Sequence, residues 1–179
     1  MVWYMGNENA AAKRTTYLLL FTGMLPLLII LAMSLHNPES SVLSRIAVMT
    51  DNIPAFTSLH NPLMTKVMDV YCKTAPLMAL IMFATTVKHT KINTKKINDW
   101  ATAIRITVGS ILFYTFFVYV FTFHNFELTS MRRPVKNMAS NDILLFIIYA
   151  SVYFLFFFTT YGVLLSSVIL KNFIKERRK

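Results

Sequence analysis

The chain has 179 residues, of which 55% are hydrophobic and only 15% charged, and its formal net charge is +10. A soluble domain of this length would carry more charge, so the composition indicates a membrane protein. The single cysteine, Cys72, excludes an intrachain disulfide and a thiol–disulfide relay. Four glycines and no hydrolase or metalloprotease motif argue against a nucleotide cradle or an enzyme, and no cofactor is expected.

Four apolar runs are each long enough to cross a hydrocarbon core, which takes about 20 helical residues. They cover residues 17–35, 62–87, 104–123 and 143–170. We therefore predict an all-α polytopic membrane protein, with four transmembrane helices in an antiparallel bundle and a single integral membrane domain over residues 1–179. The first run is too long for a signal peptide and lacks a cleavage site, so we expect an uncleaved anchor.

The positions of the basic residues predict the orientation of these spans. The N-terminal arm, the second loop and the C-terminal tail hold two, five and five lysines and arginines, against five in the first and third loops when Lys66 is included. Cytoplasmic segments carry the excess of Lys and Arg. Both termini are thus expected in the cytoplasm and the first and third loops outside it. Topology explains the net charge, so a nucleic-acid partner is not expected.

The first loop contains the pentapeptide SLHNP twice, at residues 34–38 and 58–62. Asparagine followed by proline provides a good N-cap and a good first helical residue, so each copy predicts the start of a helix. After the first copy in the sequence, apolar residues on one face predict a short amphipathic helix over about residues 38–50, lying on the membrane surface. His36 and His60 lack acidic or cysteine partners at ligand spacing, so we do not expect a metal site.

The second span carries three charged residues, Lys66, Asp69 and Lys73, in its first half. Residues three and four apart share a helix face, so the three form a ladder of alternating charge. An ionisable group costs about 2.5–3.5 kcal/mol at the centre of a membrane helix, which makes the ladder a functional-site hypothesis. In the alternative, Lys66 and Asp69 lie in the headgroup layer and Lys73 extends its side chain toward it.

The third loop, residues 124–142, is long enough to fold back on itself, and it includes Glu127, Arg132 and Arg133. Asn141 and Asp142 near its end predict an N-cap and a negative first turn for the last helix. That last apolar run has 28 residues without a charge. A helix of this length would measure about 42 Å, so it must tilt or project from the bilayer.

Three segments carry a resemblance to a known family. They are NPLMTKVMDVYCKTAP at residues 61–76, NFELTSMRRPVKNMASND at 125–142 and FFTTY at 157–161. Together they strongly resemble the immunity proteins of the colicin A type, which protect producers of the pore-forming colicins A, B, N and U. The resemblance runs over most of the chain, whereas the N-terminal arm, the first SLHNP copy and the second loop look individual to this protein.

The resemblance implies a protein of the bacterial inner membrane that binds the pore-forming domain of a cognate colicin and prevents voltage-dependent channel opening. The expected partners are that toxin domain and the lipid bilayer, with no small-molecule substrate. Our predicted partner-binding residues are Lys66, Asp69, Lys73, Glu127, Arg132 and Arg133. Two alternatives stay open: that Asp69 and Lys73 only tie the second span to its neighbours, and that the protein is a small transporter or channel subunit using Asp69.

Overall fold

The computed structural model of the protein describes residues 10–87 and 100–177. Most of the basic second loop, at residues 88–99, lies outside this range. The elements are α1 (Ala10–His36), α2 (Ser41–Met49), β1 (Phe56–Thr57), α3 (Pro62–Cys72), α4 (Ala75–Thr86), α5 (Trp100–Phe123), β2 (Phe126–Glu127), the 3-10 helix η3 (Leu128–Ser130), α6 (Arg133–Ala139) and α7 (Asp142–Arg177). The predicted all-α class is confirmed, and a pair of two-residue strands is the one addition within the described segments.

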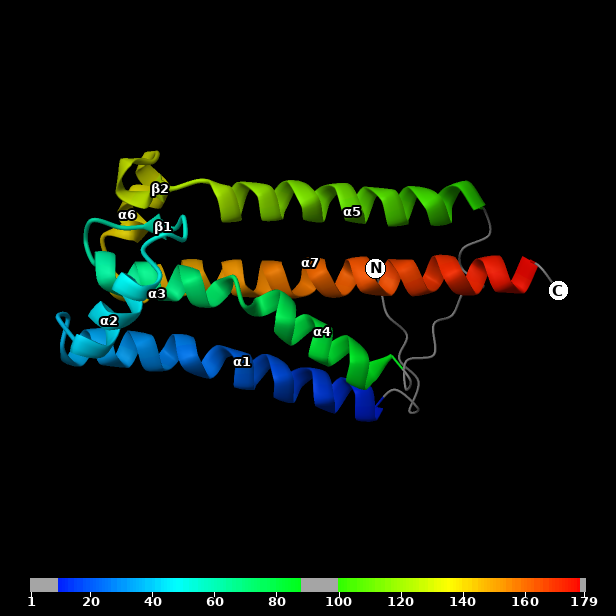
Figure 1. The fold of residues 1–179 in the computed structure, drawn as a ribbon, viewed down its shortest axis with the longest axis horizontal. Helices are drawn as coiled ribbons and strands as arrows, with labels where there is room; N and C mark the ends of the chain where they lie inside the picture. Colours follow the sequence, from blue (N-terminus) through cyan, green and yellow to red (C-terminus); the bar gives the residue numbers. More distant parts are fainter. Residues whose placement is uncertain (1–9, 88–99, 178–179) are drawn as a thin grey trace.

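Four helical segments of the described chain are long and apolar enough to cross a membrane, as predicted. They are Arg14–His36, Pro62–Thr86, Trp100–Phe123 and Asp142–Lys171. Successive segments run in opposite directions along the long axis of the molecule (Figure 1). α4 and α7, which run in the same direction, pack against each other, and α1 packs against both.

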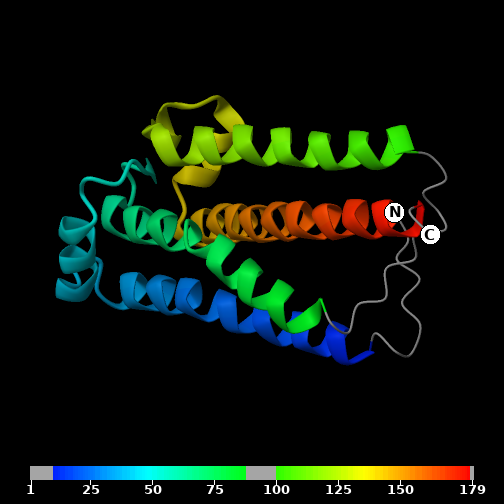
Figure 2. The same cartoon turned by 45° about the vertical axis from the view of Figure 1, so that its right-hand side comes forward.

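Helix α5 lies on the other side of α7, which is its main helix neighbour (Figure 2). Only 11% of its most apolar part is buried, against 39% for α7. One side of α5 packs on α7 through Ala103, Thr107 and Phe117, which are buried, and most of its other side chains are exposed. In a bilayer α5 therefore presents most of its surface to lipid or to a partner.

The second membrane segment is interrupted where α3 ends and α4 begins. Pro76 has no N–H group, so it cannot bond to the carbonyl of Cys72 one turn earlier. The chain makes tighter turns here instead: Thr74 N donates to Tyr71 O at 2.9 Å and Leu77 N donates to Thr74 O at 3.0 Å. The continuous helix that we predicted over residues 62–87 is thus two shorter helices forming one membrane segment.

The two SLHNP copies behave differently. Asn61 of the second copy caps α3, since its side chain accepts from Met64 N at 3.3 Å. The first copy ends a helix, because α1 continues through His36. The predicted amphipathic helix exists as α2, but it begins at Ser41, and Ser40 at its N-cap position makes no side-chain cap bond.

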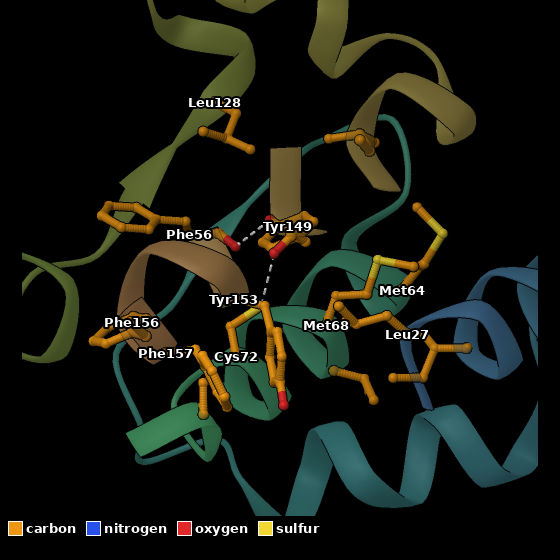
Figure 3. Close-up of a cluster of buried hydrophobic side chains, with 14 of the residues drawn as sticks. Leu27, Phe56, Met64, Met68, Cys72, Leu128, Tyr149, Tyr153, Phe156 and Phe157 are labelled. Atoms are coloured by element: carbon orange, nitrogen blue, oxygen red, sulfur yellow. Dashed lines mark hydrogen bonds between the residues drawn. The ribbon is translucent and has the colours of Figure 1, made fainter. Parts of the chain in front are cut away.

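The core lies where α1, α3 and α7 meet (Figure 3). Its largest buried side chains include Leu27, Met64, Met68, Tyr149, Tyr153 and Phe157. Tyr153 also sets the identity of Gly23 on α1: a Cβ atom on this glycine would overlap Oη of the tyrosine and lie 2.9 Å from its Cζ. The rings of Tyr71 and Tyr153 stack with centroids 5.6 Å apart, and this stacking holds the Tyr153 ring next to Gly23 on α1.

Candidate functional site

The first and third loops gather at one end of the molecule, which we call the loop end (residues 37–61 and 124–141; Figures 1 and 2). Strands β1 and β2 join the two loops in a parallel pair, with Phe56 opposite Phe126. Phe126 N donates to Ala55 O at 3.3 Å, and Ala55 N donates to Asn125 Oδ1 at 2.8 Å. The two loops therefore form one connected surface.

Asn61 ties this surface to three helices. Besides capping α3, its Nδ2 donates to Ser34 Oγ near the end of α1 at 2.6 Å and to Asp142 Oδ1 at the start of α7 at 3.3 Å. His60 Nε2 lies 3.6 Å from the same Asp142 oxygen. Among the described residues no three His, Cys, Asp or Glu side chains are placed to hold a metal ion. The hydrogen bonds of Asn61 therefore fix the ends of α1, α3 and α7 relative to one another.

The charge ladder faces the first loop. Lys66 Nζ donates to Ile53 O at 2.5 Å. Lys73 Nζ donates to Pro54 O and, at 2.7 Å, to Asp69 Oδ2. Lys66, Asp69 and Lys73 thus lie together as predicted, and the two lysines bind the backbone of the chain just before β1.

Burial explains why these charges are needed. The side chain of Asp69 is 1% exposed and that of Lys73 is 13% exposed, so neither charge is solvated by bulk water. Residues 51–55 lie outside the helices and strands, and Ala55 and Phe56 are buried. Non-helical backbone away from water is tolerated only when its carbonyls find donors inside the protein. For the buried carbonyls of Ala55 and Phe56 the donors are Phe126 N and the Tyr149 hydroxyl. Lys73 supplies the donor for the half-buried carbonyl of Pro54, and Lys66 donates to Ile53 O at the exposed part of the segment. We call residues 51–57 the lysine-anchored loop.

The three predicted residues of the third loop have different environments. Glu127 Oε1 accepts from Thr129 N at 3.1 Å and caps η3. Arg132 and Arg133 are exposed at the start of α6. No ion pair within the described chain joins them to the ladder. The link is indirect, since Glu127 pairs with Thr57 across the strands.

Sequence reasoning missed two side chains that hold the lysine-anchored loop. Tyr149 on α7 donates its hydroxyl to Phe56 O at 2.6 Å (Figure 3), and Asn125 accepts from Ala55 as described above. The signal in the sequence was a tyrosine in an apolar span, because a buried hydroxyl needs a hydrogen-bond partner. Nothing in the sequence indicated that this partner would be a carbonyl 93 residues away.

The comparisons with known proteins agree over nearly the whole chain. A family model described as colicin immunity protein matches residues 39–178. The chain is 43% identical over 172 residues to the colicin-A immunity protein of Citrobacter freundii, covering 96% of each chain. It is 33% identical over 175 residues to the colicin-B immunity protein of Escherichia coli, covering 96% of this chain and 97% of that relative. Identity to the colicin-N immunity protein of Escherichia coli is 28% over 103 residues, 57% of this chain and 77% of the relative.

No solved structure matches the chain. The matched residues include the second, third and fourth membrane segments, the lysine-anchored loop and the whole third loop. Together with the resemblance in the three motifs and the four apolar helices, these matches show that the chain belongs to the colicin immunity protein family.

Proposed function

We propose that the protein binds the pore-forming domain of a colicin of the A type in the bacterial inner membrane and prevents voltage-dependent opening of its channel. The observation that carries the proposal is the 43% identity, over 96% of both chains, to a colicin-A immunity protein. The four apolar helices support it, because a membrane-embedded protein can meet an inserted toxin within the bilayer. Binding alone suffices, and no catalytic step is required.

The energies involved suit such a mechanism. A membrane potential acts with about 2.3 kcal/mol per elementary charge per 100 mV, so the movement of a few gating charges drives opening by several kcal/mol. Changing a two-state equilibrium from 1:99 to 99:1 takes about 5.5 kcal/mol of differential binding. One interface that prefers the closed toxin can supply this amount.

We further propose that both termini are cytoplasmic and that the loop end faces the periplasm. The distribution of Lys and Arg supports this orientation. The collection of both predicted outer loops at one end of the molecule is compatible with it. A colicin that arrives through the periplasm would then encounter the loop end first.

We assign contact to Arg132 and Arg133 in the loop end, and positioning to the charge ladder, which holds the lysine-anchored loop. The two arginines are exposed on the surface that strands β1 and β2 and α6 build. Asp69, at 1% exposure and bonded to Lys73, cannot touch a partner unless the loop above it moves. The same burial gives no support to a transporter or channel subunit using Asp69, because the carboxylate is closed off from solvent and its Oδ2 is bonded to Lys73.

Survival of sensitive bacteria tests the proposal. Cells that produce the protein are challenged separately with colicins A, B, N and U, and with a nuclease colicin that enters through the same receptor. We expect protection against one pore-former and normal killing by the nuclease colicin. If the protein is present in the inner membrane and no pore-forming colicin is resisted, the proposal fails, and solute flux in proteoliposomes becomes the next measurement.

Charge reversal tests the assignment of the contact residues. We expect the variant Arg132→Glu/Arg133→Glu to accumulate in the membrane as the parent does and to lose protection. Arg45→Glu is the matched control, because Arg45 is an exposed arginine of α2, also at the loop end. Full protection by the double variant would show that these arginines do not contact the toxin.

A further inference from the structure

The surface of α5 contains an open groove of about 590 Å³, and at its start the ring of Trp100 stacks on Phe173 of α7 with centroids 6.0 Å apart. The groove extends from Trp100 to Leu112, and Ala101, Arg105 and Gly109 line it between them. Residues at this spacing lie on one face of a helix. The opposite face holds Ser110, whose Oγ lies 3.0 Å from Ser166 Oγ on α7, so Ala101, Arg105 and Gly109 lie on the face turned away from α7.

Arg105 gives the groove a positive charge. Its side chain is exposed, and no acidic side chain of the described residues pairs with it. It lies five residues after Trp100, or about 7.5 Å along the helix axis. Tryptophan prefers the membrane–water interface, so the guanidinium lies near the boundary between headgroups and hydrocarbon. A cation at this depth attracts anionic lipid headgroups, by about 1 kcal/mol for each basic residue near the surface.

The rest of the groove suits a hydrocarbon chain. Beyond Arg105 it is lined by Val108, Gly109 and Leu112, and a Cβ atom built on the glycine would meet nothing within 4 Å. From Ala101 to Leu112 the helix rises about 16 Å, which matches half of a hydrocarbon core of about 30 Å. The groove thus runs from the interface to about the bilayer midplane, as one acyl chain does.

We propose that this groove binds a phospholipid with an anionic headgroup, which places its phosphate on Arg105 and an acyl chain along Gly109 toward Leu112. Charge favours this occupant over an apolar helix, because the guanidinium attracts an anion at the level of the interface. A planar guanidinium also binds phosphate in a two-pronged geometry. The site goes beyond colicin binding, and it does not depend on which toxin the protein recognises.

Trp100 provides a direct reporter, since it lines the groove and is 40% exposed. The chain contains two tryptophans, so Trp3→Phe leaves Trp100 as the single fluorophore. The full chain carrying this change is reconstituted in phosphatidylcholine with a minor fraction of phosphatidylglycerol. In one sample the phosphatidylglycerol carries brominated acyl chains, and in the other an equal mole fraction of the phosphatidylcholine carries them. The quenching of Trp100 fluorescence is compared between the two samples.

We expect brominated phosphatidylglycerol to quench more than its mole fraction predicts, with a local enrichment on the order of fivefold from one basic residue. Arg105→Gln should remove the excess quenching, and Arg105→Lys should keep most of it. Arg14→Gln is the matched control, because Arg14 is exposed near the start of α1, at the same end of the molecule as the start of α5. Equal quenching by the two lipids, or excess quenching that survives Arg105→Gln, would overturn the proposal.

Discussion

The buried pair of Asp69 and Lys73 allows the positioning role of the charge ladder to be tested. Lys73→Met removes the one cation that is bonded to the carboxylate among the described residues, and it also removes the donor to Pro54 O. Asp69→Asn leaves the Lys73 ammonium bonded to Pro54 O, and the lysine side chain is 13% exposed. The two single changes are therefore unequal, and their combination removes both charges together.

The structure sets the order of the effects. Lys73→Met leaves an uncompensated buried charge, which costs about 3–5 kcal/mol of unfolding free energy. Asp69→Asn loses a charge-assisted hydrogen bond at a site where the cation keeps one partner, which costs about 1–3 kcal/mol. In the double variant neither charge of the pair is left, and Pro54 O has lost its donor. Adding Asp69→Asn to Lys73→Met should therefore restore about 2 kcal/mol.

Denaturant titration in mixed detergent micelles, followed by circular dichroism, measures these differences. Lys136→Met is the control, since Lys136 is exposed on α6 and the change should alter stability by less than about 0.5 kcal/mol. Membrane accumulation and colicin protection are measured in parallel. A positioning role predicts that the double variant recovers accumulation and protection together, whereas a contact role predicts recovered accumulation without protection.

The reasoning would be refuted by a double variant that is no more stable than Lys73→Met alone. That result would mean that the carboxylate gains nothing from its cation, and that the unpaired Pro54 carbonyl accounts for the whole loss.

Two further predictions concern the core. Gly23→Ala should destabilise the protein by about 1–3 kcal/mol, because the new methyl overlaps the fixed ring of Tyr153. Gly162→Ala, with open space around its Cβ, should be neutral or stabilising, and equal denaturation midpoints for the two variants would contradict this. Tyr149→Phe leaves Phe56 O without its donor and should cost about 1–3 kcal/mol, measured in the same titration, while an unchanged midpoint would show that the hydrogen bond contributes nothing.

Features set by local chemistry were predictable from the sequence. The four membrane segments follow from the length of apolar runs, and the start of α3 follows from the Asn61–Pro62 pair. Asn141 caps α7 as its sequence predicts, since its Oδ1 accepts from Ile143 N at 2.9 Å. These features depend on a few neighbouring residues and on the thickness of the bilayer.

Other local predictions failed where two signals competed. The first SLHNP copy has the same cap sequence as the second, yet the helical run that precedes it continues into His36 and uses the pentapeptide as an end. Pro76 interrupts the second membrane segment, although its apolar composition alone favours one helix. In both cases the sequence contained both signals, but it did not show which of the two would prevail.

The sequence by itself determined that Lys66, Asp69 and Lys73 share one face of a membrane helix, because helical periodicity fixes which residues are neighbours. Only the tertiary structure decided what they face. The two lysines meet the carbonyls of residues 53 and 54, and β1 pairs with a strand 70 residues further along the chain. Backbone carbonyls are the same in every residue, so no side-chain pattern identifies which of them will lack a donor. That choice depends on how the two loops pack over α3 and α7.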